Sequence, residues 1–208
     1  MIDVDAVNFS LCGSGIITNM NEEANADWKK EMDERLDRFF FNRPIYAELT
    51  APLLEKASDE DLLQIIYDNI ILKIGDDWAR QFEIIASLSD GRKMIYSTWG
   101  GEVEVNNGGF NQYYFNSSGE FAETALWAFR LIGANRFADL MARANSVFLE
   151  NRDALESFDD GTLESFSESY KDNPLNELDD IFYRLQDEEN LQKLRIDYVR
   201  ANISEFVP

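Results

Sequence analysis

Apolar residues at helical spacing fill residues 58–75, and this pattern limits the possible folds more than any other part of the chain. Ser58 is a good N-cap residue, and the three acidic residues after it suit the positive end of a helix dipole. A wide apolar stripe follows, formed by Leu62, Leu63, Ile65, Ile66, Tyr67, Ile70, Ile71, Leu72 and Ile74. A stripe of this width predicts a central, buried helix, which we expect to end at Gly75.

Helical spacing also describes most of the remaining sequence. Helices are expected over 22–41, 46–57, 78–86, 89–99, 121–132, 137–148, 178–185 and 191–206. The only alternating segment, 102–105, is too short to predict a sheet. The predicted fold class is therefore all-α, a compact multi-helix domain with a kinked central Asn-Gly-Gly-Phe region. We interpret residues 1–58 as an N-terminal extension with one or two helices, and 59–208 as the all-α domain.

The central stretch over 102–119 is unusually rich in amides, glycines and aromatic residues. Gly100-Gly101 is expected to interrupt the preceding helix, and a turn or kink then leads into the next one. We interpret as structural the residues Asn106, Asn107, Gly108, Gly109, Phe110, Gln112, Tyr113, Asn116 and Gly119. Glycine and asparagine tolerate positive φ, and amides can bind backbone groups at a tight turn. A ligand pocket or a stacking platform for bases is the alternative.

The aromatic side chains of this stretch have the spacing of core residues. Phe110, Tyr113, Tyr114 and Phe115 are expected to be buried, with one tyrosine hydroxyl near the surface.

The residue types that are missing exclude several kinds of chemistry. The chain has no histidine and a single cysteine, Cys12, so it lacks the usual general base and cannot build a Cys/His zinc site. A hard-metal or carboxylate-pair site at Glu102, Glu104 and Asn106 is the remaining enzymatic alternative. We predict no enzyme activity, no cofactor and no metal. The N-terminus resembles no signal peptide and no apolar run could span a bilayer, so the expected location is the cytoplasm.

Negative charge is concentrated in residues 150–189, which we call the acidic segment. The chain carries a net charge of −21, and this segment contributes −11 through fourteen acidic and three basic residues. Such a surface repels nucleic acid and anionic membranes and attracts basic partners. A solvated face that serves solubility is the simplest explanation.

Carboxylates recur every three or four residues in this segment, at Asp153, Glu156, Asp160, Glu164, Glu168 and Asp172. On one helix they would form a single stripe, although Gly161 allows a turn between two short helices. Like charges at this spacing destabilise a helix by a few tenths of a kcal/mol per pair, about 1–2 kcal/mol in total. The alternative to a solvated face is a row of anionic groups that imitates nucleic-acid phosphates.

The run over 104–119 resembles the signature of a bacterial family of acidic, helical DNA-mimic proteins, much of which is known only as a domain of unknown function. The resemblance continues in 125–126, 132–134, 137–144 and 178–183, and it covers roughly residues 60–208. It implies an all-α domain, commonly a dimer. It also implies, from the characterised member of the family, surface carboxylates that imitate the phosphate backbone and occupy the DNA-binding face of a transcription factor.

The predicted function is therefore an interaction protein that binds the basic DNA-contacting face of a transcription factor or nucleoid protein and blocks DNA binding. The partner-binding residues we expect are Asp153, Glu156, Asp160, Glu164, Glu168, Asp172, Asp179 and Asp180. The expected partners are this basic protein and a second copy of the chain, with no direct binding to nucleic acid or membrane. The alternatives are an immunity-type or regulatory partner of a basic toxin or nuclease, and a carboxylate-based hydrolase.

Overall fold

The computed structural model describes residues 43–158 and 162–208. Those from Ile45 onward belong to one compact unit, Ile45–Pro208. The predicted all-α class is confirmed, since the described residues contain helices and no strand. The predicted helix over 22–41 lies outside the described residues, and the proposed division at residue 58 stays a prediction. No described helix is both long enough and apolar enough to cross a membrane.

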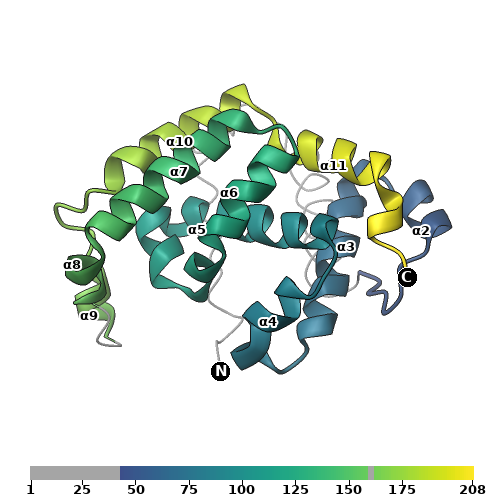
Figure 1. The fold of residues 1–208 in the computed structure, drawn as a ribbon, viewed down its shortest axis with the longest axis horizontal. Coiled ribbons are helices and arrows are strands. Elements are labelled where there is room, and N and C mark those ends of the chain that lie inside the picture. Colours follow the sequence, from purple (N-terminus) through teal and green to yellow (C-terminus); the bar gives the residue numbers. More distant parts are fainter. Residues whose placement is uncertain (1–42, 159–161) are drawn as a thin grey trace, which may run out of the picture. The chain divides into compact units, whose positions relative to one another are not determined.

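Helices joined by short turns make up the unit, as Figure 1 shows. The α-helices are α2 (Ala51–Lys56), α3 (Asp59–Ile74), α4 (Gln81–Ala86), α5 (Asp90–Phe115), α6 (Ala122–Leu131), α7 (Asn135–Glu150), α8 (Arg152–Glu156), α9 (Leu163–Glu168), α10 (Asn176–Glu188) and α11 (Leu191–Ala201). Short 3₁₀ helices are η2 (Trp78–Arg80), η3 (Ser117–Phe121) and η4 (Ile203–Glu205).

Helix α3 begins and ends where the sequence predicts. The Ser58 hydroxyl accepts a hydrogen bond from the backbone N–H of Asp61 at 3.2 Å, which satisfies one free donor of the first turn. Gly75 follows the last turn with φ of 57°, a backbone conformation that favours glycine. The apolar stripe is narrower than predicted. Leu72 is 50% exposed, because it lies on the side of α3 away from the core residues Ile66 and Ile70.

Helix α5 is the 26-residue centre of the unit. Ser89 caps its start, as predicted. The expected interruption at Gly100-Gly101 is wrong, because the helix continues through both residues and through the candidate strand over 102–105. Gly101 serves a different purpose: a Cβ there would lie 3.4 Å from Cε2 of Tyr113, so the missing side chain leaves room for this ring. The interruption falls instead at Gly108 and Gly109, whose backbone angles are not helical.

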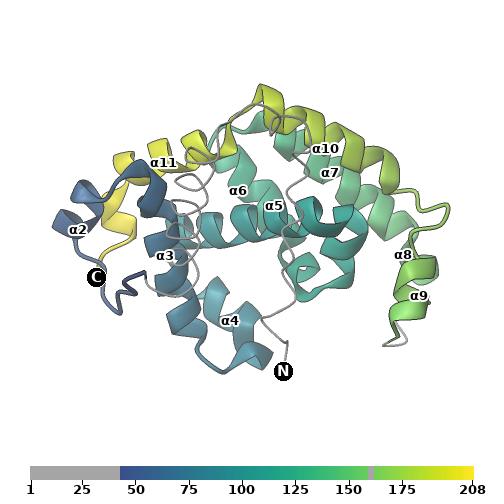
Figure 2. The ribbon, with the colours of Figure 1, turned by 180° about the vertical axis from the view of Figure 1, so that it is seen from behind.

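The core forms where α5, α6, α7 and α10 pack together. Buried rings from these helices meet edge to face, with 5.9 Å between the centroids of Phe110 and Phe182 and 5.4 Å between those of Phe137 and Phe182. Helices α7 and α10 run side by side in both views, and α8 and α9 lie at the opposite end of the unit from α2 and α3 (Figures 1 and 2).

Candidate functional site

Two glycines bend α5 shortly before its end. Gly108 has φ −156° and ψ 30°, and Gly109 has φ 68° and ψ −175°, a combination that only glycine adopts readily. A Cβ at Gly109 would also lie 2.2 Å from Oδ2 of Asp179 on α10. Glycine is therefore required here both by the backbone angles and by the closeness of α10. We call this pair of residues the bend.

Asp179 caps the part of α5 that follows the bend. The N–H of Phe110 has no helical partner there and donates a hydrogen bond to Asp179 Oδ1 at 2.8 Å. Burial raises the pKa of Asp179 above its ordinary value, and the charge of Asp180 adds to this, while the hydrogen bond from Phe110 acts in the opposite direction. The sequence prediction placed Asp179 on the partner-binding surface. In the structure its carboxylate is half-buried and faces α5.

Buried polar side chains connect the bend to the turn between α9 and α10. Asn111 Nδ2 donates to Ser169 Oγ at 2.7 Å, and Asn173 Nδ2 donates to Asn111 Oδ1 at 2.8 Å. Leu175 N donates to Asn173 Oδ1 at 2.9 Å. These polar groups satisfy one another without water, so the network fixes the turn against α5. Sequence reasoning missed Ser169 and Asn173, because their partner lies about 60 residues away in the chain.

Two tyrosines add hydrogen bonds to the backbone of α5 on the near side of the bend. The hydroxyl of Tyr170 donates to the carbonyl of Gly108 at 2.9 Å, and that of Tyr183 donates to the carbonyl of Val105 at 3.0 Å. The acidic segment is thus attached to α5 at several points.

The remaining amides of the central stretch hold the end of α5 together. Gln112 Nε2 and Asn116 Nδ2 both donate to Glu104 Oε2, at 2.7 and 2.8 Å. Asn106 and Asn107 are exposed within α5. Glu104 is therefore engaged by Gln112 and Asn116, while the structural role that we predicted for Asn106 and Asn107 stays a prediction.

Glycine at the next turn is needed for close packing. A Cβ at Gly119 would lie 3.0 Å from the Cα of Tyr114. Phe110 and Tyr113 are fully buried, as predicted for core residues. Tyr114 and Phe115 are only partly buried, and the Tyr114 hydroxyl donates to Asn145 Oδ1 at 2.6 Å.

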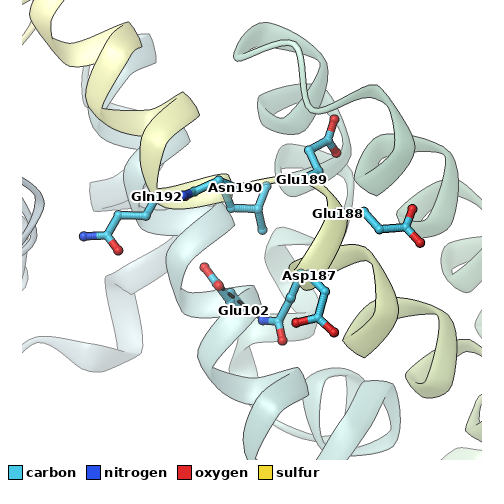
Figure 3. A pocket seen from close by; sticks show the side chains of 8 residues that line it. Glu102, Asp187, Glu188, Glu189, Asn190 and Gln192 are labelled. Atoms are coloured by element: carbon cyan, nitrogen blue, oxygen red, sulfur yellow. Dashed lines mark hydrogen bonds between the residues drawn. The ribbon is translucent and has the colours of Figure 1, made fainter.

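The three residues of the carboxylate-pair alternative, Glu102, Glu104 and Asn106, do not line one pocket together. Glu102 lines a pocket of about 350 Å³ where α10 meets α11, and the residues around it are Gln186, Asp187, Glu188, Glu189, Asn190, Leu191 and Gln192 (Figure 3). Neither Glu104 nor Asn106 lines it. Glu102 itself is paired with Arg195, and among the described residues no group of acidic side chains is arranged to hold a metal ion.

The acidic segment folds as separate short helices. Helix α8 ends at Glu156 and α9 begins at Leu163, so a single helical stripe from Asp153 to Asp172 is wrong and the alternative with two short helices holds. Repulsion between carboxylates one turn apart disfavours a longer helix here. The predicted residues Asp153, Glu156, Glu164, Glu168, Asp172 and Asp180 are exposed. Asp160 lies outside the described residues.

Basic residues neutralise only part of this surface. Ion pairs join Arg152 to Glu156 at 2.6 Å, Lys171 to Glu168 at 2.7 Å, and Arg136 of α7 to Glu188. Within the described part of the acidic segment, exposed carboxylates without a hydrogen-bond or ion-pair partner are Glu150, Asp153, Glu164, Asp172, Glu177, Asp180 and Asp187. These groups can meet a basic partner without first breaking an internal contact.

Comparison with known proteins gives one match. The sequence model of a family described as DMP19-like protein matches residues 86–202, which include the bend and the whole acidic segment. No curated protein and no solved structure matches the chain.

Proposed function

The chain belongs to the DMP19-like protein family, and on that basis we propose that it is a non-enzymatic DNA mimic that acts in the cytoplasm. Its carboxylates bind the basic DNA-contacting face of a transcription factor or nucleoid protein and compete with DNA for that face. The observation that carries the proposal is the set of exposed carboxylates that have no partner among the described residues of the acidic segment, inside the part of the chain that matches the family.

The charge pattern of α10 supports this proposal. Asp180 and Asp187 lie on the side of the helix opposite the buried residues Phe182 and Leu185. Glu177 lies three residues before Asp180, a spacing of about 5–6 Å at Cβ on a helix, and Asp187 follows Asp180 seven residues later on the same side. A face built to bind phosphates can therefore form charge-assisted hydrogen bonds with them.

Salt dependence follows from this kind of contact. Each pair of opposite charges that forms on binding is screened by ions, and the Debye length falls from about 30 Å at 0.01 M to about 10 Å at 0.1 M salt. Affinity should therefore fall steeply between these concentrations, and most of the change should lie in the association rate.

The test begins with capture of binding proteins from an extract of the source organism by the immobilised full chain. A captured protein is then purified, and competition between the chain and a short DNA duplex is measured by fluorescence anisotropy. The proposal expects the duplex and the chain to exclude each other. Captured proteins that bind no DNA, or that bind DNA and the chain at the same time, would overturn it. Capture of a basic toxin or nuclease inhibited away from its DNA-binding face would favour the immunity-type alternative.

A matched pair of charge variants locates the binding face. Glu164→Gln, Glu177→Gln and Asp180→Asn together remove three exposed charges from the acidic segment. The control variant Glu55→Gln, Glu60→Gln and Asp76→Asn removes three exposed charges from α2, from α3 and from the turn after α3. The first triple variant should lose about tenfold or more in affinity at low salt, and the control less than about threefold. Equal losses would show that only net charge matters.

The second partner we propose is another copy of the chain. The surface of α6 and α7 suits a homodimer, because its three basic residues equal its three acidic ones in number, so two copies would repel each other less there than at the acidic segment; the basic residues are Arg130, Arg136 and Arg143, and the acidic ones are Glu123, Asp139 and Glu150. Trp127 and Leu131 are more than one-third exposed on α6. Light scattering should give a dimer mass for the chain and a monomer mass for Trp127→Glu. A monomeric unmodified chain would contradict this assignment.

A further inference from the structure

Helix α10 holds α5 on both sides of the bend. Before the bend, the Tyr183 hydroxyl donates to the carbonyl of Val105 at 3.0 Å. After it, the N–H of Phe110 donates to Asp179 Oδ1 at 2.8 Å. Asp179 and Tyr183 are four residues apart, so they lie one above the other on the same side of α10. One turn of α10 therefore spans the bend and holds both parts of α5 against α10.

The neighbouring, solvent-facing side of the same helix carries free charge. Asp180 follows Asp179 directly, yet its carboxylate is exposed and has no partner among the described residues. Because a helix is rigid over this length, the position of Asp180 and Asp187 in space depends on how α10 is attached to α5. The residues that attach α10 to α5 and the exposed carboxylates thus belong to the same helix.

Asp179 contributes to this attachment as an acceptor more than as a charge. Its carboxylate is half-buried, and its burial disfavours the ionised form. The hydrogen bond to Phe110 needs only an oxygen at Oδ1, which asparagine can also supply. Replacing Asp179 by asparagine therefore keeps the contact, whereas alanine removes it and leaves the N–H of Phe110 unsatisfied.

We propose that Asp179 and Tyr183 are positioning residues, which fix the outward carboxylates of α10 in the arrangement that a basic partner recognises. This inference rests on the proposed function for its biological meaning, but its structural part stands alone. The two residues would not touch the partner. They would act through the bend and through Asp180 and Asp187.

The structural part is tested without a partner. Spin labels are attached at Glu60→Cys on α3 and Glu177→Cys on α10, in a chain with Cys12→Ser, and the distance distribution is measured by pulsed electron resonance. The unmodified chain and Asp179→Asn should give the same narrow distribution. Asp179→Ala and Tyr183→Phe should each broaden or shift it. Distributions that stay unchanged in both of these variants would overturn the proposal, and Tyr183→Phe keeps the test open if Asp179→Ala does not fold.

The functional part compares two neighbouring residues that carry the same charge. Asp179→Asn and Asp180→Asn each remove one negative charge, and binding to the captured DNA-binding protein is measured at low and high salt. Asp179→Asn should stay within about twofold of the unmodified chain, and Asp180→Asn should lose about threefold, with a weaker salt dependence. Asp179→Ala should lose about fivefold to tenfold, with fast amide exchange at Phe110.

Two results would overturn the functional part. One is an equal loss for Asp179→Asn and Asp180→Asn, which would make Asp179 a surface charge. The other is an unchanged affinity for Asp179→Ala. If the unmodified chain competes with no DNA-binding protein at all, the proposed function fails, and the distance measurement still decides whether Asp179 and Tyr183 fix α10.

Discussion

Arg195 on α11 lies with its Nη1 atom 2.6 Å from Oε2 of Glu102 on α5. The arginine is 2% exposed and also donates to the side chain and the carbonyl of Thr98, at 2.9 and 3.0 Å. Burial lowers the pKa of Arg195, and the neighbouring Glu102 acts against this shift. The two partners differ in one respect: Glu102 reaches the pocket between α10 and α11, whereas Arg195 does not line it.

The first prediction follows from this difference. Glu102→Ala leaves a fully buried positive charge without its partner, at a cost of about 3 kcal/mol or more. Arg195→Met removes the buried charge and leaves Glu102 beside the pocket, where water can reach it, so the loss should be smaller by about 1 kcal/mol. Urea unfolding of both variants measures the two free energies. A larger loss in Arg195→Met would show that Glu102 is not hydrated through the pocket.

The second prediction concerns the pH dependence that Asp179 gives to stability. Its pKa in the folded chain is raised above 3.8, mainly by burial, so the folded state binds this proton more tightly than the unfolded state does. The contribution of Asp179 to the free energy of unfolding therefore falls as the pH rises from its unfolded pKa through its folded pKa. Asparagine does not titrate, so the stability of Asp179→Asn should rise relative to that of the unmodified chain over this pH range.

Urea unfolding from about pH 3 to pH 7 tests the pH effect. The stability difference between Asp179→Asn and the unmodified chain should grow through the acidic range and then stay constant. Asp180→Asn, at the exposed neighbouring position, is the control for the loss of one charge. A difference that grows toward low pH would mean that the Asp179 carboxylate stabilises the fold through its charge.

The third prediction compares two glycines of α5. Gly109→Ala should lose about 2–4 kcal/mol, because alanine is strained at φ 68° and its Cβ would collide with the Asp179 carboxylate. At Gly100 a Cβ would meet nothing within 4 Å. Gly100→Ala should therefore raise the free energy of unfolding by about 0.5–1 kcal/mol through the higher helix propensity of alanine. Thermal unfolding followed by circular dichroism measures both. A stable Gly109→Ala variant would show that the bend can relax.

The fourth prediction concerns two neighbouring tyrosines. The hydroxyl of Tyr113 is buried and finds no hydrogen-bond partner in the described part of the chain, whereas that of Tyr114 donates to Asn145. Tyr113→Phe should leave stability unchanged or raise it by up to about 1 kcal/mol, and Tyr114→Phe should lower it by about 1 kcal/mol. If Tyr113→Phe is the more destabilising of the two, its hydroxyl has a partner such as a buried water.

Local signals were enough to predict the helices and several of their ends. Ser58, Ser89 and Gly75 act at the positions that capping chemistry assigns to them. The two glycine pairs of α5 were harder to separate, since Gly100-Gly101 and Gly108-Gly109 look alike in sequence. Only the structure shows that Tyr113 packs on Gly101 while Asp179 approaches Gly109. Such contacts join residues far apart in the chain, and no local pattern contains them.

The same limit applies to the acidic surface. The expected partner-binding residues included both Asp179 and Asp180, although one faces α5 and the other faces solvent. The sequence indicated the region where exposed charge is concentrated and could not tell which carboxylates are committed to the fold. Burial and the position of the partner helix decide that.

The bend in α5 separates what keeps this scaffold together from what it displays. Hydrogen bonds with α10 and with the turn before it converge on residues 105–111, and none of them uses Asp180 or Asp187. The residues at these outward positions can therefore be substituted without removing any of the hydrogen bonds at the bend. A designer could keep the bend, vary only the charges on the solvent side of α10, and obtain a panel of proteins with one architecture and different targets.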